Sequence, residues 1–287
     1  MGAIFRHELR NYFHSLTAYV FGAFLLAVVG LGSVLYNLQA AVSNFEFVLS
    51  FASIIFVVIV PILTMRTMAE ERRQRTDQLL YSLPITTTQV VLGKYLALLV
   101  VYLIPLAVIS LYPLLFSQFG DVYLPTPYGS LFAFFMMGAA LLAVGMFLSS
   151  LTDNQGFAAG IGIAAILLNY YSVSLAEYTS STAMGSLIAL YVIALLLGVV
   201  IRGLTRNENL AYGVTLVLIA ALSVAYFVNS SAFEGLLPDI MTKLSLFRQF
   251  NSFVNGAFDL TAIVYYVSVM GFFLFLSVQS MEKRRYN

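Results

Sequence analysis

Eight long apolar runs alternate with short polar stretches along the 287 residues of the chain. A bilayer core of about 30 Å takes roughly 20 apolar helical residues, and each run is close to that length. The pattern predicts an all-α polytopic membrane helix bundle. Its eight transmembrane helices are predicted at residues 16–38, 47–65, 90–116, 129–148, 156–175, 184–201, 211–228 and 262–278. A single re-entrant pair is the alternative interpretation of residues 184–228.

A shorter amphipathic pattern precedes the first run. Phe5, Leu9, Tyr12 and Phe13 share one face of a helix. Residues 1–15 are therefore predicted to form an interfacial helix, an elbow that lies in the membrane plane before the first span. A frayed basic terminus is the alternative interpretation.

The composition agrees with a membrane protein. Charged residues make up 9% of the chain, against about 25% in a soluble domain, and 61% of the residues are hydrophobic. This leaves too little polar surface for a water-soluble enzyme, a nucleic-acid-binding protein or a disordered chain. The chain has no Cys, and its two histidines, His7 and His14, precede the first run. We therefore expect no disulfide, no reactive thiolate and no metal site.

The distribution of positive charge predicts the orientation. With eight spans and a cytoplasmic N-terminus, every Lys and Arg except Lys243 and Arg248 lies on the inner side. Removing one span would invert the sides of all later charges, so both termini are predicted to be cytoplasmic. The first run is longer than the roughly 7–15 apolar residues of a signal peptide. We expect it to remain as a span of a multi-pass protein of the plasma membrane, in a prokaryotic inner membrane.

The longest stretch between spans, residues 229–260, then lies on the outer side. Its apolar residues repeat at helical spacing until Gly256, a predicted helix stop. This pattern predicts a short amphipathic pair of helices at the outer leaflet. An inert interfacial loop is the alternative.

No charged residue lies in the middle third of any predicted span. Ion-coupled transporters and many channels keep ionisable groups at that depth, and intramembrane proteases need a buried catalytic group. Energy for uphill transport would therefore have to come from another polypeptide. Some polar residues remain within spans, and we predict that four of them line a translocation path, with ordinary helix packing as the alternative: Tyr102, Tyr112, Asn169 and Tyr170.

The predicted cytoplasmic loop at residues 66–89 contains two capping boxes, in which a Thr is followed by Glu or Gln three residues later. Thr67 with Glu70 predicts a helix that begins near residue 68. Thr86 with Gln89 predicts the start of the third span.

Pro84 ends the first of these two helices, which leaves a cytoplasmic helix at residues 68–83 between two spans. One interpretation is a solvated connector that carries positive-inside charges. The other is a coupling helix that inserts into a soluble motor subunit.

Three stretches resemble the type 2 ABC exporter permeases. The string AEERRQRTDQLLYSLPITTTQVVLGKYLA is similar to their first cytoplasmic loop, with matches at Glu70, Glu71, Arg72, Thr76, Leu79, Leu80, Pro84, Gly93 and Lys94. It departs from the family pattern at Arg75, where Gly is usual, and at Gln78, where Glu is usual. The stretch SSLTDNQGFAAG resembles the second inner loop, with matches at Ser149, Leu151, Thr152, Asn154 and Gln155. The C-terminal stretch resembles the gliding-motility and nitrous-oxide-reduction permeases, with matches at Phe250, Phe253, Gly256, Asp259, Tyr265 and Tyr266.

The resemblance implies a single transmembrane permease domain over residues 1–287, in which residues 184–228 add a pair of helices to a six-helix exporter core. It implies P-loop ABC ATPase subunits and a second permease copy or a paralogue as partners, within membrane lipids. It further implies contacts with the ATPase from Glu70, Glu71, Arg72, Arg75, Thr76, Asp77, Leu79, Leu80, Thr152, Asn154 and Gln155. An outer gate is implied at Phe247, Phe250 and Phe253.

The motor itself is not expected in this chain. Gly93-Lys94 is followed by Tyr95, and Thr88 stands where a P-loop has its first Gly. We therefore expect a non-catalytic chain that binds no cofactor, with ATP and magnesium on the partner ATPase. A mechanotransmission subunit that moves no cargo is the alternative function, and a secondary transporter is a third.

Overall fold

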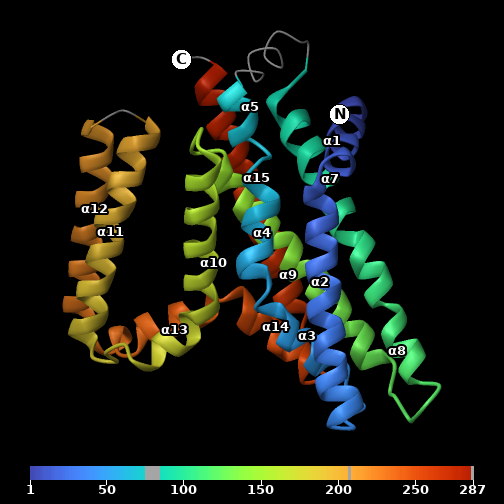
Figure 1. Ribbon diagram of the computed structural model, residues 1–287. Helices are drawn as coiled ribbons and strands as arrows, with labels where there is room; N and C mark the ends of the chain where they lie inside the picture. The colour runs from blue at the N-terminus through green and yellow to red at the C-terminus, as the bar shows by residue number, and fades with distance from the viewer. Residues whose placement is uncertain (75–84, 206–207, 286–287) are drawn as a thin grey trace. The chain divides into compact units, whose positions relative to one another are not determined.

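The computed structural model describes residues 1–74, 85–205 and 208–285 (Figure 1). Within these ranges all regular secondary structure is helical, as predicted. The chain divides into two compact units. Unit 1 consists of Met1–Tyr170 and Gln249–Asn287, and unit 2 consists of Tyr171–Arg248.

In the described ranges, unit 1 is built mainly from ten helices, with most of α10 (Gln155–Glu177) and the end of α14 (Leu246–Val254) added to them. The ten are α1 (Gly2–His14), α2 (Leu16–Ser33), the π-helical η1 (Val34–Gln39), α3 (Glu46–Ser53), α4 (Phe56–Thr64), α5 (Ala69–Gln74), α7 (Thr87–Ile109), α8 (Leu111–Phe116), α9 (Pro125–Ser149) and α15 (Leu260–Arg285).

Helix α9 is the centre of unit 1 and packs against α15, α4, α3 and α7. Small residues allow this packing. A Cβ atom on Gly138 would lie 2.5 Å from the hydroxyl oxygen of Tyr102 on α7, and Gly145 faces Thr64 of α4 in the same way. Glycine at both positions therefore lets neighbouring helices approach α9 closely.

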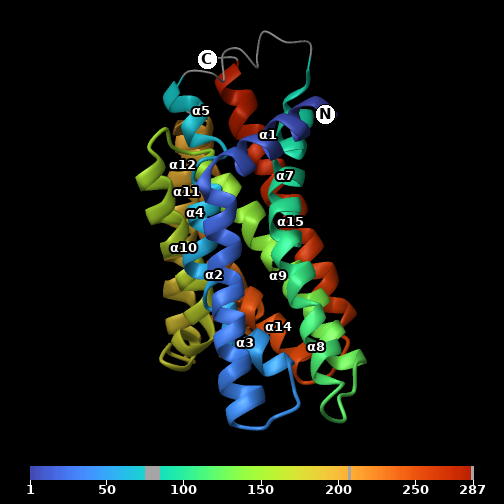
Figure 2. The ribbon, with the colours of Figure 1, turned by 45° about the vertical axis from the view of Figure 1, so that its right-hand side comes forward.

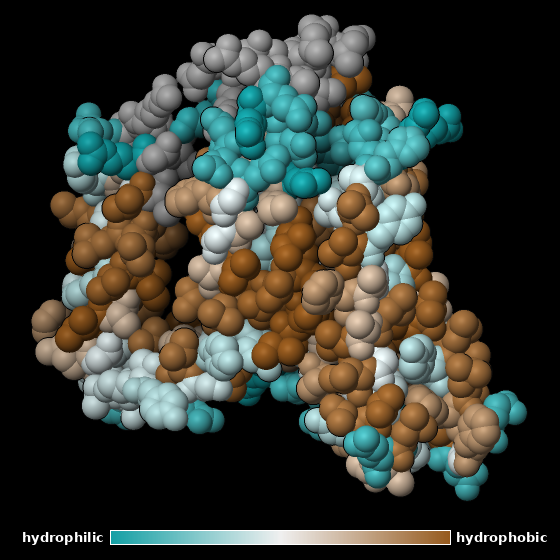
Figure 3. Space-filling view, in the orientation of Figure 1, coloured by the Kyte–Doolittle hydropathy of each residue, from teal (hydrophilic) through white to brown (hydrophobic). Residues whose placement is uncertain are grey.

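The segments predicted to be cytoplasmic gather at one end of unit 1. Helices α1 and α5, the start of α7 and the end of α15 lie together there (Figures 1 and 2). Thr87 on α7 donates a hydrogen bond of 2.8 Å to Glu282 on α15. In the space-filling view of unit 1, polar residues gather at this end, and apolar residues cover the middle of the visible face (Figure 3).

Six of the eight predicted spans correspond to described helices that are long and apolar enough to cross a membrane. These are Leu16–Gln39, Thr87–Phe116, Pro125–Ser149, Gln155–Glu177, Glu208–Val228 and Leu260–Lys283. The second predicted span is a broken pair, Glu46–Ser53 and Phe56–Gln74, bent by 60°. The sixth contains the shorter apolar stretch Ala183–Val199. The total of eight stays a prediction.

Unit 2 contains the predicted extra pair of helices, α11 (Ala183–Thr205) and α12 (Glu208–Val228). They pack against each other, and the hydroxyl groups of Tyr191 and Ser223 form a hydrogen bond of 2.7 Å between them. The predicted outer segment follows as the 3₁₀-helical η2 (Ser230–Phe233), α13 (Leu236–Lys243) and α14. Gly256 has a φ of 80° beyond α14, which agrees with the predicted helix stop.

Candidate functional site

The close approach of α1 to α7 depends on a glycine. A Cβ atom on Gly93 would lie 3.1 Å from the Cγ2 atom of Ile4. Because Gly93 has no side chain, α1 lies directly against α7 at this level. The contact brings Glu8 of α1 beside Lys94, the residue that follows Gly93.

Lys94 is the centre of a buried ion cluster, which we define as Lys94, Glu8 and Glu71. Only 1% of the Lys94 side chain is exposed. Its Nζ atom donates hydrogen bonds to Glu8 Oε1 at 2.7 Å, to Glu71 Oε1 at 2.5 Å and to the carbonyl of Thr67 at 3.1 Å. These three acceptors match the three donors of an ammonium group.

The ion cluster connects three separate parts of unit 1. Glu8 comes from α1, Glu71 from α5 and Lys94 from α7. Removing an ammonium group from water costs several kcal/mol unless it is paired with good geometry, so the cluster is stable only while the three helices stay together. A displacement of α5 must therefore move α1 and α7 with it or break these contacts.

A cavity of about 870 Å³ lies beside the ion cluster. It is lined by Ala3, Ile4, His7, Glu8, Asn11, Tyr12, His14, Ser15, Thr17, Arg66, Thr67, Glu70, Glu71 and Gln74. Burial, followed by the charges of Glu8, Glu71 and Glu70, raises the pKa of the Tyr12 hydroxyl well above its ordinary value, whereas Arg66 lowers it. The acidic groups outweigh Arg66, so the lining of this cavity is net acidic.

Arg72 forms a second buried contact of α5. It donates hydrogen bonds to the carbonyl oxygen of Ser150 and, at 3.5 Å, to the hydroxyl of Ser280 on α15. The Ser280 hydroxyl also donates to the Ser150 carbonyl at 2.9 Å. Arg72 thus joins α5 to the end of α9 and to α15, two helices that the ion cluster does not include.

The start of α5 is capped from another helix. The amides of Met68 and Ala69 donate to the Ser149 hydroxyl at 3.3 and 3.2 Å. The hydroxyl of Thr67 instead donates back to the carbonyl of Thr64. The predicted cap by Thr67 is therefore wrong, because Ser149 supplies the acceptor, although the helix begins close to the predicted residue.

The predicted cap at the start of the third span is confirmed. The Thr86 side chain accepts a hydrogen bond of 3.3 Å from the amide of Gln89. In the second inner loop, Asn154 Oδ1 accepts from the amides of Gly156 at 2.9 Å and Phe157 at 3.3 Å. Asn154 thus caps α10.

Of the residues predicted to contact an ATPase, the structure places Glu70, Glu71 and Arg72 on α5. Thr152, Asn154 and Gln155 lie at the start of α10, and Thr152 accepts a hydrogen bond from the amide of Asn154 at 3.2 Å. The others, Arg75, Thr76, Asp77, Leu79 and Leu80, lie outside the described residues. Contact with an ATPase stays a prediction for all of them.

The predicted path residues have different surroundings. Tyr102 is fully buried, and its hydroxyl donates to the carbonyl of Phe134 at 2.8 Å. The ring of Tyr112 stacks on Phe45, with 5.8 Å between the centroids. Asn169 and Tyr170 lie half-buried on α10. Tyr102 therefore has a structural contact that is independent of any path, and the path stays a prediction.

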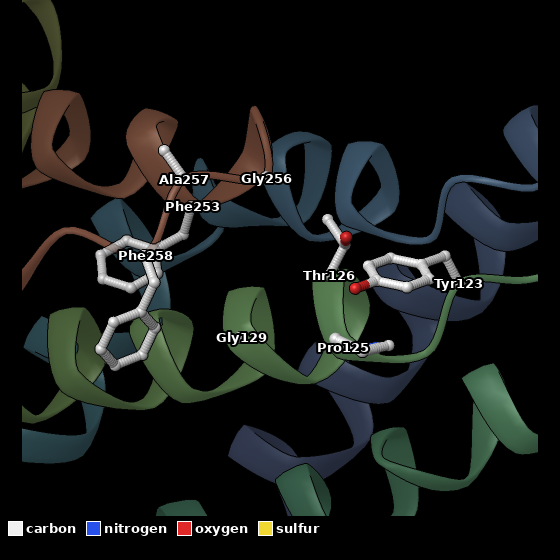
Figure 4. A pocket seen from close by; sticks show the side chains of 8 residues that line it. All are labelled: Tyr123, Pro125, Thr126, Gly129, Phe253, Gly256, Ala257 and Phe258. Atoms are coloured by element: carbon white, nitrogen blue, oxygen red, sulfur yellow. The ribbon is translucent and has the colours of Figure 1, made fainter.

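The three predicted gate residues, Phe247, Phe250 and Phe253, are buried residues of α14. Next to Phe253 is a cavity of about 240 Å³, lined by Tyr123, Pro125, Thr126, Gly129, Phe253, Gly256, Ala257 and Phe258 (Figure 4). The rings of Phe253 and Phe258 lie 5.6 Å apart in an edge-to-face arrangement. Three of the eight lining residues are aromatic, and none of the eight is charged.

The sequence did not predict the role of Glu8 in the ion cluster, or the contact between Thr87 and Glu282. Glu8 is part of the amphipathic pattern of residues 1–15, and no local spacing relates it to Lys94, which lies 86 positions later. Among the described residues, no group of three or more His, Cys, Asp or Glu side chains could hold a metal ion.

Most of the residues of this site lie in a part of the chain that matches a known protein family. Residues 29–176 match the family described as ABC-2 family transporter protein. The matched range contains Glu71, Arg72, Lys94 and Ser149 but not Glu8 or α15. It also ends before α11 and α12. A search of curated proteins finds no match.

Proposed function

Because the chain belongs to the ABC-2 family of transporter proteins, we propose that it is the membrane subunit of an ATP-driven exporter. Membership of this family and six apolar helices make it a multi-pass membrane protein of an ABC transporter. In the proposal, residues 1–287 form one permease domain that supplies the translocation path. A separate P-loop ABC ATPase binds ATP and magnesium and supplies the energy.

We further propose that residues 68–83, of which the structure describes α5, couple the ATPase to the path. The ion cluster is the observation that supports this role. Lys94 binds Glu71 at 2.5 Å and Glu8 at 2.7 Å, so a push on α5 is transmitted to α7 and α1. Arg72 transmits the same push to α9 and α15 through Ser150 and Ser280.

Substitution of Glu71 by Gln tests the coupling role. Gln keeps the shape of the side chain but removes the charge that faces Lys94. In liposomes that contain the permease and its ATPase, we expect Glu71→Gln to retain ATPase binding and hydrolysis while cargo transport falls about tenfold or more, which corresponds to roughly 1.4 kcal/mol. The matched control is Asp121→Asn, a charge loss at an exposed residue outside the site. Equal transport in both variants would refute coupling through the ion cluster.

Crosslinking gives a second test of the partner. A photoreactive residue at Arg73, which is exposed on α5, should capture the ATPase. The same residue at Asp121 should not, because Asp121 is predicted to lie on the outer side. Capture of the ATPase from both positions would show that the crosslinking is non-specific.

The cargo is proposed to be amphipathic or lipid-linked. The predicted spans have no charge in their middle third, which suits a pathway for apolar or peptide-like molecules. ATPase stimulation by lipids, peptides and drugs in the reconstituted complex would identify the class. The proposal fails if no apolar cargo changes the rate.

The alternative function is a mechanotransmission subunit, which relays ATPase motion to an outer partner without moving cargo. The outer segment and its aromatic residues, Phe247, Phe250 and Phe253, would then contact that partner, whereas in an exporter they would form the gate. Steady ATP hydrolysis without cargo movement in liposomes would favour this alternative. In both cases we propose a pair of permeases, from two copies or a paralogue, in the lipids of a prokaryotic inner membrane.

A further inference from the structure

The cavity of about 870 Å³ beside the ion cluster is large enough for an organic molecule, since ligand pockets in proteins span about 300–1,000 Å³. It is lined by residues of α1 and α5 and of the segments that adjoin them. All of these residues belong to unit 1, and they lie at the end where the predicted cytoplasmic segments gather (Figures 1 and 2). The polar groups that face the cavity decide what it can bind.

Tyr12 brings a hydroxyl group without a partner to this cavity. The residue is 6% exposed and belongs to the lining. Its main-chain carbonyl accepts a hydrogen bond from Ser15, but in the part of the chain that the structure describes its hydroxyl forms none. The hydroxyl is not enclosed by protein atoms either, so it opens into the cavity. Buried polar groups are nearly always hydrogen-bonded, which indicates that the partner of this hydroxyl comes from outside the chain.

Three carboxylates lie near the Tyr12 hydroxyl. Burial raises the pKa of this hydroxyl, and the charges of Glu8, Glu71 and Glu70 raise it further, so all three act on the same group. Glu8 and Glu71 are also next to each other, because their Oε1 atoms accept hydrogen bonds from the same Lys94 Nζ atom. The Oε2 atom of Glu8 has no hydrogen-bond partner within the described ranges. This part of the cavity therefore offers acceptor oxygens that the chain itself does not use.

The charges of the lining favour a cation. Counted with neutral histidines, the lining carries three carboxylates and one guanidinium group, that of Arg66. Lys94 lies outside the lining and offsets one further carboxylate, so one negative charge is left. Among the described residues, no group of three or more His, Cys, Asp or Glu side chains could hold a metal ion, which favours an organic cation over a metal ion.

We propose that the cavity binds the primary ammonium group of an organic molecule, with Glu8, Glu70 and the Tyr12 hydroxyl oxygen as its acceptors. An ammonium group has three N–H donors and no acceptor, which matches these three groups. Ala3 and Ile4 of the same lining provide apolar surface for the carbon chain that carries the ammonium group. The molecule is either a free aliphatic amine or the ethanolamine headgroup of a phospholipid, and the two share this chemistry. The site does not depend on the coupling role proposed above.

Thermal unfolding of the full-length chain in phosphatidylcholine nanodiscs tests the site, because a ligand of the folded state raises the thermal midpoint. The probe is propylammonium chloride. The control is tetramethylammonium chloride, which carries the same charge but has no N–H donor. We expect a saturable rise of the midpoint with propylammonium, and with tetramethylammonium no rise beyond that of an equal concentration of sodium chloride. Equal rises with both cations, or no saturable rise with the probe, would overturn the inference.

Two variants change the acceptors and leave the hydrogen bonds of Lys94 intact. Tyr12→Phe should weaken propylammonium binding about tenfold, and Glu70→Gln should weaken it about two- to fivefold. The matched controls are Tyr95→Phe, which removes a buried hydroxyl that bonds to the Ala139 carbonyl outside the cavity, and Asp121→Asn. Each variant is compared with its own midpoint without probe, and both controls should bind the probe as the wild-type chain does. Wild-type affinity in Tyr12→Phe and Glu70→Gln would refute the site.

Phosphatidylethanolamine in the nanodiscs distinguishes the two sources of the ammonium group. If the lipid headgroup is the occupant, it competes with the probe, and the apparent affinity for propylammonium falls in the wild-type chain. If the occupant is a free amine, the apparent affinity stays the same as in phosphatidylcholine. Binding is measured without an ATPase, so a negative result here leaves the coupling proposal unaffected, and failure of Glu71→Gln to reduce transport leaves this site unaffected.

Discussion

Among the described residues, the ion pairs of the two units are of opposite kinds. In unit 1, Lys94 is 1% exposed and holds Glu8 and Glu71 at hydrogen-bonding distance. In unit 2, Arg202 and Glu208 are 53% and 57% exposed, and Lys243 and Asp239 are 70% and 50% exposed. In all of these pairs the charged atoms are close together, so the distance between them does not distinguish the two units. The exposed fraction of the side chains does distinguish them.

Exposure decides what each ion pair can do. A solvated pair contributes about 0–1 kcal/mol, because water replaces either partner when the other is removed. A buried pair leaves an uncompensated charge when one partner is lost. The pairs of unit 2 therefore have little influence on their helices, whereas the ion cluster of unit 1 fixes α1, α5 and α7 relative to one another.

The largest expected effect tests this contrast directly. Lys94→Met should lower the unfolding free energy by about 3–5 kcal/mol, since Glu8 and Glu71 lose their shared counter-ion. The matched variant Lys243→Met should lower it by less than about 1 kcal/mol. Denaturant titration of the purified chain in detergent micelles measures both values. Equal losses would mean that burial is not what distinguishes the two units.

The second contrast uses arginine. Arg72→Met removes the donor to the Ser150 carbonyl and the Ser280 hydroxyl, and we expect a loss of about 2–3 kcal/mol for a buried charged hydrogen bond. Arg202→Met removes an exposed pair with Glu208 and should change stability by less than about 1 kcal/mol. The same titration measures these variants. A larger effect from Arg202 would contradict the comparison.

The third contrast concerns helix packing. Gly138→Ala should cost about 1–3 kcal/mol, because its Cβ atom would lie 2.5 Å from the Tyr102 hydroxyl. On α12, a Cβ atom added to Gly213 would meet no atom within 4 Å, so Gly213→Ala should be neutral or stabilise the helix by up to about 1 kcal/mol. Opposite signs for the two substitutions, measured by the same titration, would support the difference in packing. A loss from Gly213→Ala would show that α12 is packed in the molecule in solution.

The sequence predicted what depends on local spacing. Apolar runs of span length predicted six helices that pass the length and hydropathy criteria, because one helix can satisfy its own backbone in a membrane. The cap by Thr86 was also predicted from local spacing, because the Thr86 side chain and the amide of Gln89 lie three residues apart.

What the sequence did not predict depends on contacts between distant residues. The motif contained both Glu71 and Lys94, but the partner Glu8 lies 86 residues before Lys94, and no periodicity relates the two. The Thr67 cap was wrong for the same reason, because Ser149 caps α5 from 80 residues away. The 60° break in the second predicted span was not predicted either, because its apolar pattern is continuous.

The smallest expected effects come from two tyrosine hydroxyls that bond between helices. Tyr102→Phe removes a hydrogen bond to the Phe134 carbonyl in unit 1, and we expect a loss of about 1 kcal/mol. Tyr191→Phe removes the bond to Ser223 in unit 2. Ser223 keeps its own bond to the Ile219 carbonyl, so the loss there should be about 0.5 kcal/mol, as is common between membrane helices. Denaturant titrations repeated to sufficient precision separate these two values. If Tyr191→Phe were the more destabilising variant, hydrogen bonds between helices would stabilise unit 2 at least as much as unit 1. The difference between the two units would then apply to their ion pairs alone.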